Sequence, residues 1–202
     1  MTPRSRIAPA VAAAVLGASL AAAARPSFGE AATYALDPEH ATVAFLVPHI
    51  GFAKVLGQFR EVEGSFRFDE AAGELSDIEI VVQTESVTTG HEGRDRHLRS
   101  ADFLDSDRFP RMRFVAASAR RTGERTFDIE GELELRGVTR PLTLHATWNK
   151  SADYPIGNRA YVTGASARGV VKRSDYGMTY ALDNGWVGDE VEILIEIEAR
   201  RR

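Results

Sequence analysis

The chain has 202 residues, of which 44% are hydrophobic and 27% are charged, and its formal net charge is -4 at pH 7. This balance suits one globular domain with a sizeable core, and it excludes a disordered or fibrous chain and a basic nucleic-acid-binding protein. The sequence contains no cysteine, which excludes disulfides, thiol chemistry and a lipid-modified cysteine.

Residues 1–31 are predicted to be a secretory signal peptide. Arg4 and Arg6 precede an uncharged, alanine-rich run over 7–24, and small residues suited to cleavage lie between about 24 and 31. The run is nearly long enough to span a bilayer, so a retained membrane anchor is the alternative. Because most of the run is alanine, we favour cleavage. The mature domain, residues 32–202, would then lie in the periplasm or be secreted.

The first part of the mature chain has the pattern of strands. A short extended piece over 33–36 ends at the turn residues Asp37 and Pro38. Large apolar residues then alternate with other residues over 42–49, 55–68 and 77–83. A period of two residues is typical of strands with one apolar face.

The stretch 94–114 breaks this rhythm. Leu98, Ala101 and Leu104 recur at three-residue spacing, as on one face of a short helix, and Pro110 cannot lie inside that helix. A polar loop over 86–93 leads into it. We therefore expect a short, charged helical segment that covers one end of a set of strands.

Strand patterns return after this segment and continue to the C-terminus. They cover 111–116, 127–136, 142–148, 161–172 and 190–198. The whole pattern predicts about eight antiparallel strands in hairpin order without helical crossovers, which indicates an all-β sandwich or an up-and-down barrel. We favour an eight-stranded antiparallel barrel of one domain.

The inward side chains are uneven in size, with aromatic residues such as Phe45 and Phe114 set among small ones such as Gly131 and Ala167. An eight-stranded barrel either fills its interior or holds one slim ligand. The pattern leaves both open: large and small residues could interdigitate in a solid core, or an apolar tunnel could remain. Such a tunnel would select a long, thin, apolar lipid.

Polar residues that could surround the mouth of a tunnel are His49 and those in 94–99 and 172–175. Arginines there could contact a quinone carbonyl or a phosphate. Alternatively, Arg96, Arg99, Asp95 and Asp175 could form ion pairs that fasten the covering segment.

No sequence feature supports catalysis or a metal site. His91 and His97 lack a recognised ligand spacing, and neither a nucleophile elbow nor a phosphate-binding glycine loop is present. We therefore expect no enzyme activity, no metal and no cofactor. Two alternatives are an enzyme that acts on a lipid head group through His49 and Asp95, and an outer-membrane barrel, because alternation alone does not say which face is apolar.

Several short motifs occur in a fixed order: Asp37-Pro38-Glu39-His40, Gly57-Gln58-Phe59, the run from Arg94 to Leu104, Arg136-Gly137-Val138, Arg173-Ser174-Asp175-Tyr176-Gly177, and Val187-Gly188-Asp189. This series resembles the YceI-like family, the lipocalin-like polyisoprenoid-binding proteins of bacterial periplasms. The resemblance implies a lipocalin-like barrel around a long isoprenoid, with no metal and no known catalytic step. Thr88 and Ala41 depart from it, since the family usually has aspartate and serine there.

The resemblance favours a hollow barrel with an apolar tunnel over a filled core. We expect a long-chain isoprenoid partner, such as a quinone or polyprenyl compound, in transport, storage or stress protection. We also expect transient membrane contact, possible pairing as a homodimer and no nucleic acid. The candidate ligand-binding residues are Phe45, Val47, His49, Phe59, Phe66, Phe68, Ile80, Val82, Arg96, Phe103, Phe109, Met112, Phe114, Phe127, Ile129, Leu144, Trp148, Arg173 and Asp175.

Overall fold

Residues 31–157 and 159–202 are described by the structure, a computed structural model, so the predicted signal peptide lies outside the described residues except for its last position. The described chain is mostly strand. Its elements are β1 (Ala32–His49), β2 (Ala53–Phe59), β3 (Val62–Asp69), β4 (Glu74–Gln83), η1 (Thr84–Ser86), β5 (Val87–Thr88), α1 (Glu92–Arg99), β6 (Arg111–Ser118), β7 (Arg120–Arg121), β8 (Thr126–Leu135), β9 (Val138–Asp153), β10 (Tyr161–Lys172), η2 (Arg173–Tyr176) and β11 (Glu190–Arg201).

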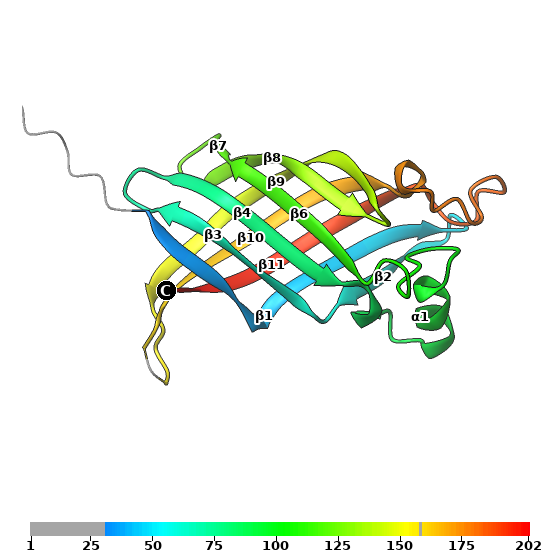
Figure 1. Cartoon of the computed structure of the whole chain (residues 1–202), viewed down its shortest axis with the longest axis horizontal. Coiled ribbons are helices and arrows are strands. Elements are labelled where there is room, and N and C mark those ends of the chain that lie inside the picture. The colour runs from blue at the N-terminus through cyan, green and yellow to red at the C-terminus, as the bar shows by residue number, and fades with distance from the viewer. Residues whose placement is uncertain (1–30, 158) are drawn as a thin grey trace, which may run out of the picture.

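Eight strands of the described chain close into an antiparallel barrel (Figure 1). They follow one another around the wall in the order β1, β3, β4, β6, β8, β9, β10 and β11, and β11 pairs back with β1. The strand β2 forms a hairpin with β1, while β5 and β7 are two-residue additions to β2 and β8. The predicted eight-stranded barrel is confirmed.

The long strand β1 contributes to the wall along its full length. It pairs with β3 over Ala32–Ala35 and with β2 over Val43–His49, and it pairs with β11 in both parts. Its register against β11 shifts between Leu36 and Ala41. The predicted turn at Asp37 and Pro38 is therefore a bulge inside one strand.

The apolar face of each strand points into the barrel and the charged face points out. In β8 the inward residues are Phe127, Ile129, Leu133 and Leu135, all buried, and the outward residues are Glu130, Glu132 and Glu134, all exposed. The core of the protein is therefore the lining of the barrel itself. This arrangement makes the size of inward side chains decide whether the interior is filled or hollow.

The helix α1 lies at one end of the barrel, beside the turn between β1 and β2 (Figure 1). His91 caps it by accepting a hydrogen bond on Nδ1 from the backbone N–H of Arg94 at 3.2 Å. The helix ends at Arg99, earlier than expected, because Ser100 is extended and its hydroxyl donates to the carbonyl of His97. No helix in the described part of the chain has the length and apolar character needed to cross a membrane.

Candidate functional site

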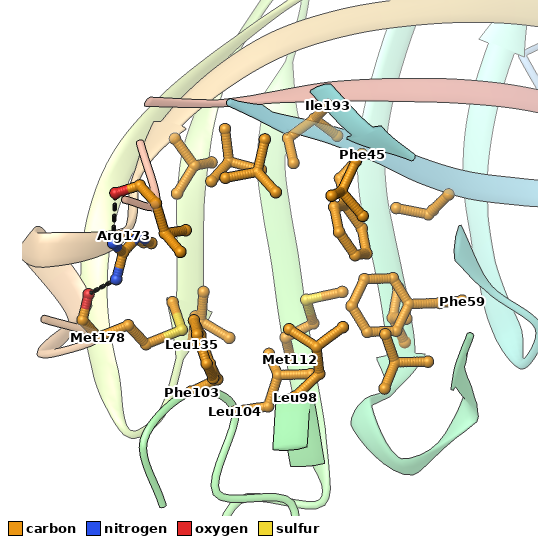
Figure 2. A pocket seen from close by; sticks show the side chains of 18 of the residues that line it. Phe45, Phe59, Leu98, Phe103, Leu104, Met112, Leu135, Arg173, Met178 and Ile193 are labelled. Atoms are coloured by element: carbon orange, nitrogen blue, oxygen red, sulfur yellow. Dashed lines mark hydrogen bonds between the residues drawn. The ribbon is translucent and has the colours of Figure 1, made fainter. Parts of the chain in front are cut away.

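A cavity of about 390 Å³ occupies the end of the barrel next to α1, which we call the mouth. Figure 2 shows Phe45 and Phe59 on one side of the open space, Arg173 and Met178 on the opposite side, and Leu98 between them on the side of the helix. The volume falls in the range of roughly 300–1,000 Å³ that is usual for small-molecule sites. The interior at the mouth is therefore hollow, as the tunnel alternative requires.

A second cavity, of about 90 Å³, lies deeper in the barrel. It is lined in part by alanines on β9 and β10, which leave more room than larger side chains would. Four residues line both cavities, so the two spaces meet at one ring of side chains: Ile80, Phe114, Leu144 and Ile195.

Glycines in the wall let two aromatic rings lie against the sheet. A Cβ atom on Gly57 would come within 2.2 Å of Cζ of Phe45, and one on Gly131 would come within 2.5 Å of Cζ of Phe114. Larger residues at either position would push these rings toward the middle of the barrel. The small residues thus keep the centre open by making room for the rings at the wall.

Aromatic side chains pack closely where the deeper cavity ends. Phe68 meets Phe127 and Trp148 edge to face, at centroid distances of 6.2 and 5.1 Å. Phe68 and Phe127 are buried, at 4% and 3% exposure. This packing closes the part of the barrel opposite the mouth, which we call the far end.

A shared carboxylate adds a polar closure at the far end. Glu70 accepts hydrogen bonds from the hydroxyls of Tyr34 at 2.7 Å and Tyr161 at 3.0 Å. Burial and the bond to Glu70 raise the pKa of Tyr34 above its ordinary value. The hydroxyl therefore stays protonated and holds β1 to the turn after β3.

In the part of the chain that the structure describes, the larger cavity is lined by arginines and histidines but by no carboxylate. Within the described residues the lining contains His49, Arg94, His97, Arg113 and Arg173, and no carboxylate. His97 bonds to Asp102 at 2.9 Å and Arg113 to Glu79 at 2.7 Å, whereas the whole protein is acidic, so the lining is a local concentration of nitrogen groups in an acidic chain. Such a mouth favours a ligand whose polar end carries acceptor oxygens.

Arg173 is the most buried of these bases, at 3% exposure. It donates to the carbonyls of Gly188, Met178 and Val187 at 2.8, 2.6 and 2.8 Å. Burial lowers the pKa of its guanidinium, although the group stays charged at neutral pH. Arg173 therefore fixes the segment 178–188 over the mouth as well as lining the cavity.

Arg94 lies at the first turn of α1, on the face that lines the cavity. Its Nε donates to the hydroxyl of Thr89 at 2.7 Å, and Nη2 donates to the carbonyl of Thr89 at 3.1 Å. These bonds fix the side chain through neutral oxygens, so its positive charge is available to a ligand.

Asp95 and Arg99 fasten α1 to the segment before it. Asp95 accepts hydrogen bonds from the backbone and hydroxyl of Thr89 at 2.7 and 2.6 Å and from the hydroxyl of Thr88 at 3.1 Å. Burial alone would raise the pKa of Asp95, but these bonds outweigh it and hold the pKa below its usual range. Arg99 donates to the carbonyls of Glu85 and Val87. Of the residues expected to form ion pairs, Arg99 pairs with Glu85 at 3.5 Å and Arg96 with Glu92 at 2.6 Å. Asp95 is instead held by threonines.

Most of the predicted ligand-binding residues line one of the two cavities. Those on the larger cavity are Phe45, Val47, His49, Phe59, Ile80, Val82, Phe103, Met112, Phe114, Leu144 and Arg173. Those on the smaller one include Phe66, Phe68, Phe127, Ile129 and Trp148. Their contact with a ligand stays a prediction.

Three predicted residues line neither cavity. Arg96 is exposed on the outer side of α1 and pairs with Glu92 at 2.6 Å. Phe109 is half-buried beside the guanidinium of Arg108, and Asp175 is exposed on η2. Each is a neighbour in sequence of residues that line the mouth, but none of the three is part of either lining.

Arg94 and His97 lie in the segment 94–99 that was predicted to surround the mouth, but they were left out of the candidate ligand-binding residues, and Arg113 was not predicted at all. The sequence did contain a signal for Arg94. It precedes the inward Leu98 by four positions, so the two side chains lie on the same face of α1, whereas Arg96 lies on another face. Arg113 is the third residue of β6, and alternation along the strand predicts that it points outward, where it donates to Glu79 at 2.7 Å. Alternation therefore gave no signal that it also lines the mouth.

One group of possible metal ligands occurs among the described residues, away from the cavity. Asp37, His40 and Glu198 place one ligand atom each within 4.8 Å of one another. Arg200 donates to the same oxygen of Asp37 at 2.7 and 3.1 Å, which opposes a cation there. We interpret the group as a set of polar contacts that stabilises the bulge of β1.

Comparison with known proteins shows that most of the described chain matches one protein family. A family model described as "YceI-like domain" matches residues 34–199. Protein YceI of Salmonella arizonae and Protein YceI of Salmonella enteritidis are each 38% identical over 170 residues, covering 83% of this chain and 86% of the relative.

Solved structures with the same fold come from other bacteria. BcnA of Burkholderia cenocepacia superposes with a TM-score of 0.72 at 18% identity, covering 81% of this chain and 98% of that chain. The Campylobacter jejuni YceI protein superposes with a TM-score of 0.67 at 25% identity, covering 77% of this chain and 90% of that chain. A polyisoprenoid binding domain from Saccharophagus degradans superposes with a TM-score of 0.62 at 14% identity, covering 84% of this chain and 98% of that chain.

Proposed function

The chain belongs to the YceI-like family, and we propose that it binds one long-chain isoprenoid lipid, an isoprenoid quinone or a polyprenyl compound, inside the barrel. The observation that carries the proposal is the apolar cavity of about 390 Å³, whose lining contains arginines and histidines and no carboxylate among the described residues. A polyisoprenoid binding domain with the same fold lends support.

The apolar wall supplies the affinity for the tail. Removing apolar groups from water contributes about 0.8 kcal/mol for each buried CH₂ group. The ring of Ile80, Phe114, Leu144 and Ile195 separates the cavities, and small movements of these side chains would let a tail pass to the deeper one. The aromatic packing at the far end then limits the length of tail that fits.

The basic mouth would receive the polar end of the ligand. Arg94 is exposed at the rim of the cavity, and His49 lies at the end of β1. Arg113 also lines the cavity, but its Nε donates to the carboxylate of Glu79 at 2.7 Å. Guanidinium groups bind carbonyl and phosphate oxygens with strong, directional hydrogen bonds. Both a quinone ring and a polyprenyl phosphate carry such oxygens.

The role we propose is binding without chemistry, in the periplasm or outside the cell, for transport, storage or stress protection. Asp95, the partner that a head-group enzyme would need beside His49, is engaged by Thr88 and Thr89 and does not line the cavity. Transient contact with a membrane and pairing as a homodimer belong to the same proposal.

The test is to extract the purified mature protein with organic solvent and identify the lipid by mass spectrometry. Leu144→Trp fills the ring between the cavities and should lower the bound lipid about tenfold by overpacking. Thr143→Trp, the adjacent outward position on β9, is the matched control and should retain the lipid. Absence of lipid from the wild-type protein, together with no binding of added quinone or polyprenyl phosphate, would refute the proposal.

A further inference from the structure

Large apolar side chains are exposed together at the mouth. Five of them lie on two segments there, the β1–β2 hairpin and the connection between η2 and β11. We call these five the apolar rim: Ile50, Phe52, Leu56, Tyr180 and Trp186, with exposures of 46, 91, 59, 45 and 56%.

The two segments of the rim are joined by backbone hydrogen bonds. The amide of Ile50 donates to the carbonyl of Trp186 at 2.8 Å, and the amide of Gly188 donates to the carbonyl of Pro48 at 2.9 Å. A bridge between His49 and Val187 lies between these bonds. Figure 1 shows the hairpin and the connection extending from the same end of the barrel as α1. The rim is therefore one surface held in place by the fold.

The rim is continuous with the lining of the cavity. Ile50, Tyr180 and Trp186 are exposed and also line the larger cavity, whereas Phe52 and Leu56 extend the apolar surface outward. Clustered apolar side chains at the opening of an apolar cavity mark an interaction site. Tryptophan and tyrosine are also the residues enriched at the interface between a membrane and water.

We propose that the apolar rim docks on the surface of a phospholipid bilayer and opens the cavity directly to it. The proposal rests on the proposed lipid-binding function. A long apolar tail that crossed water would be opposed by about 0.8 kcal/mol for each exposed CH₂, whereas a docked mouth gives it an apolar path. The rim is continuous with the cavity lining, and an isoprenoid lipid of the class proposed above dissolves in a bilayer, so we take a bilayer as the occupant of the rim.

The charges around the rim are mixed in sign. Arg94 is held by Thr89 through neutral oxygens and lines the mouth beside the rim. Exposed Asp183 lies in the same connection and weakens any purely electrostatic attraction. We therefore expect the apolar side chains to dominate, and binding to persist at high salt, where exposed charges are screened.

The test uses the full mature protein and vesicles of phosphatidylethanolamine and phosphatidylglycerol. The wild-type protein should float with the vesicles, and the emission of Trp186 should shift to shorter wavelength; Trp186→Phe should float but lack this shift. Phe52→Ser should weaken flotation about tenfold, and Phe52→Ser with Leu56→Ser more strongly, because each removes a large apolar side chain from the contact.

Ile156→Ser is the matched control, since Ile156 is 73% exposed but lies in the β9–β10 connection outside the rim. It should float like the wild type. Phe52 and Leu56 do not line the cavity, so their variants should keep the same lipid content when loaded from detergent, while transfer from vesicles slows about tenfold.

Three outcomes would overturn docking: a wild type that binds detergent-solubilised lipid but does not float, a Phe52→Ser variant that floats equally well, or self-association through the rim that excludes vesicles. Failure of the proposed function has a different signature. In that case the protein would take up no lipid from detergent, whatever its behaviour with vesicles.

Discussion

The two ends of the barrel are closed by different kinds of contact. At the far end, Phe127 is 3% exposed and packs edge to face with Phe68. At the mouth, Phe52 is 91% exposed, and hydrogen bonds from Arg173 to backbone carbonyls and from threonines to Asp95 hold the covering segments. Phe103 and Leu104 add apolar packing there, at 9% and 8% exposure. Packing in a core ties a region to global stability, whereas a short helix held by a few polar bonds can open locally. The mouth can therefore admit a ligand while the far end stays folded.

Truncating one phenylalanine at each end gives the largest expected contrast. Phe127→Ala should lower the free energy of unfolding by about 3–5 kcal/mol, because it leaves a cavity in the core. Phe52→Ala should change it by no more than about 0.5 kcal/mol, because its ring is exposed. Urea denaturation measures both. Equal losses would show that the rim is part of the stabilising core and would break the comparison.

Arg173 tests how much the polar closure of the mouth contributes. Arg173→Met leaves three backbone carbonyls without their donor, and we expect a loss of about 2–4 kcal/mol in the free energy of unfolding. Hydrogen exchange should rise in 178–188. The control is Arg96→Met, whose exposed pair with Glu92 should contribute at most about 0.5 kcal/mol. An Arg173 variant as stable as its control would contradict the role given to this residue.

Removal of the bound lipid should loosen the mouth more than the far end. A ligand at about 100 times its dissociation constant stabilises the folded state by about 2.7 kcal/mol. Delipidated protein should therefore melt at a temperature lower by roughly 5–10 °C. Hydrogen exchange should increase in α1 and in 178–188 but not around Phe68 and Phe127. Uniform loss of protection along the barrel would mean that the two ends are not independent.

The smallest expected effect concerns the pH dependence of α1. The pKa of Asp95 lies below its usual range in the folded state. Its contribution to stability is therefore fully present above the unfolded pKa of about 4 and is lost as pH falls through the folded pKa. Asp95→Asn should destabilise α1 by about 1 kcal/mol at neutral pH.

Hydrogen exchange of 87–99 as a function of pH measures this effect. The wild type should lose protection in acid, and Asp95→Asn should show a weaker dependence. Thr143→Asn, on the outward face of β9, serves as the control and should follow the wild type. An unchanged acid profile in the Asp95 variant would assign the opening to another carboxylate.

Much of the barrel wall was predictable because its cause is local. Alternation along β8 follows from the geometry of a strand. Leu98 indicated the inward face of a short helix, although α1 ends at Arg99 and Leu104 lies in the turn that follows it. The bulge at Asp37 escaped prediction because Arg200, far along the chain, stabilises the continuation of β1. The choice of Arg96 rather than Arg94 as a ligand-binding residue was an error of a different kind. The sequence contained the information to avoid it, since helical spacing from Leu98 favoured Arg94.

The sequence by itself determined the strands, the covering helix and the series of motifs that resembles one family, since spacing and side-chain type decide these along the chain. Only the tertiary structure decided that the interior is hollow, because the free volume depends on how rings such as Phe45 and Phe114 settle over glycines of other strands. It also decided which bases meet at the mouth and that Ile50 lies beside Trp186. Those contacts join residues distant in sequence, and no local pattern encodes them.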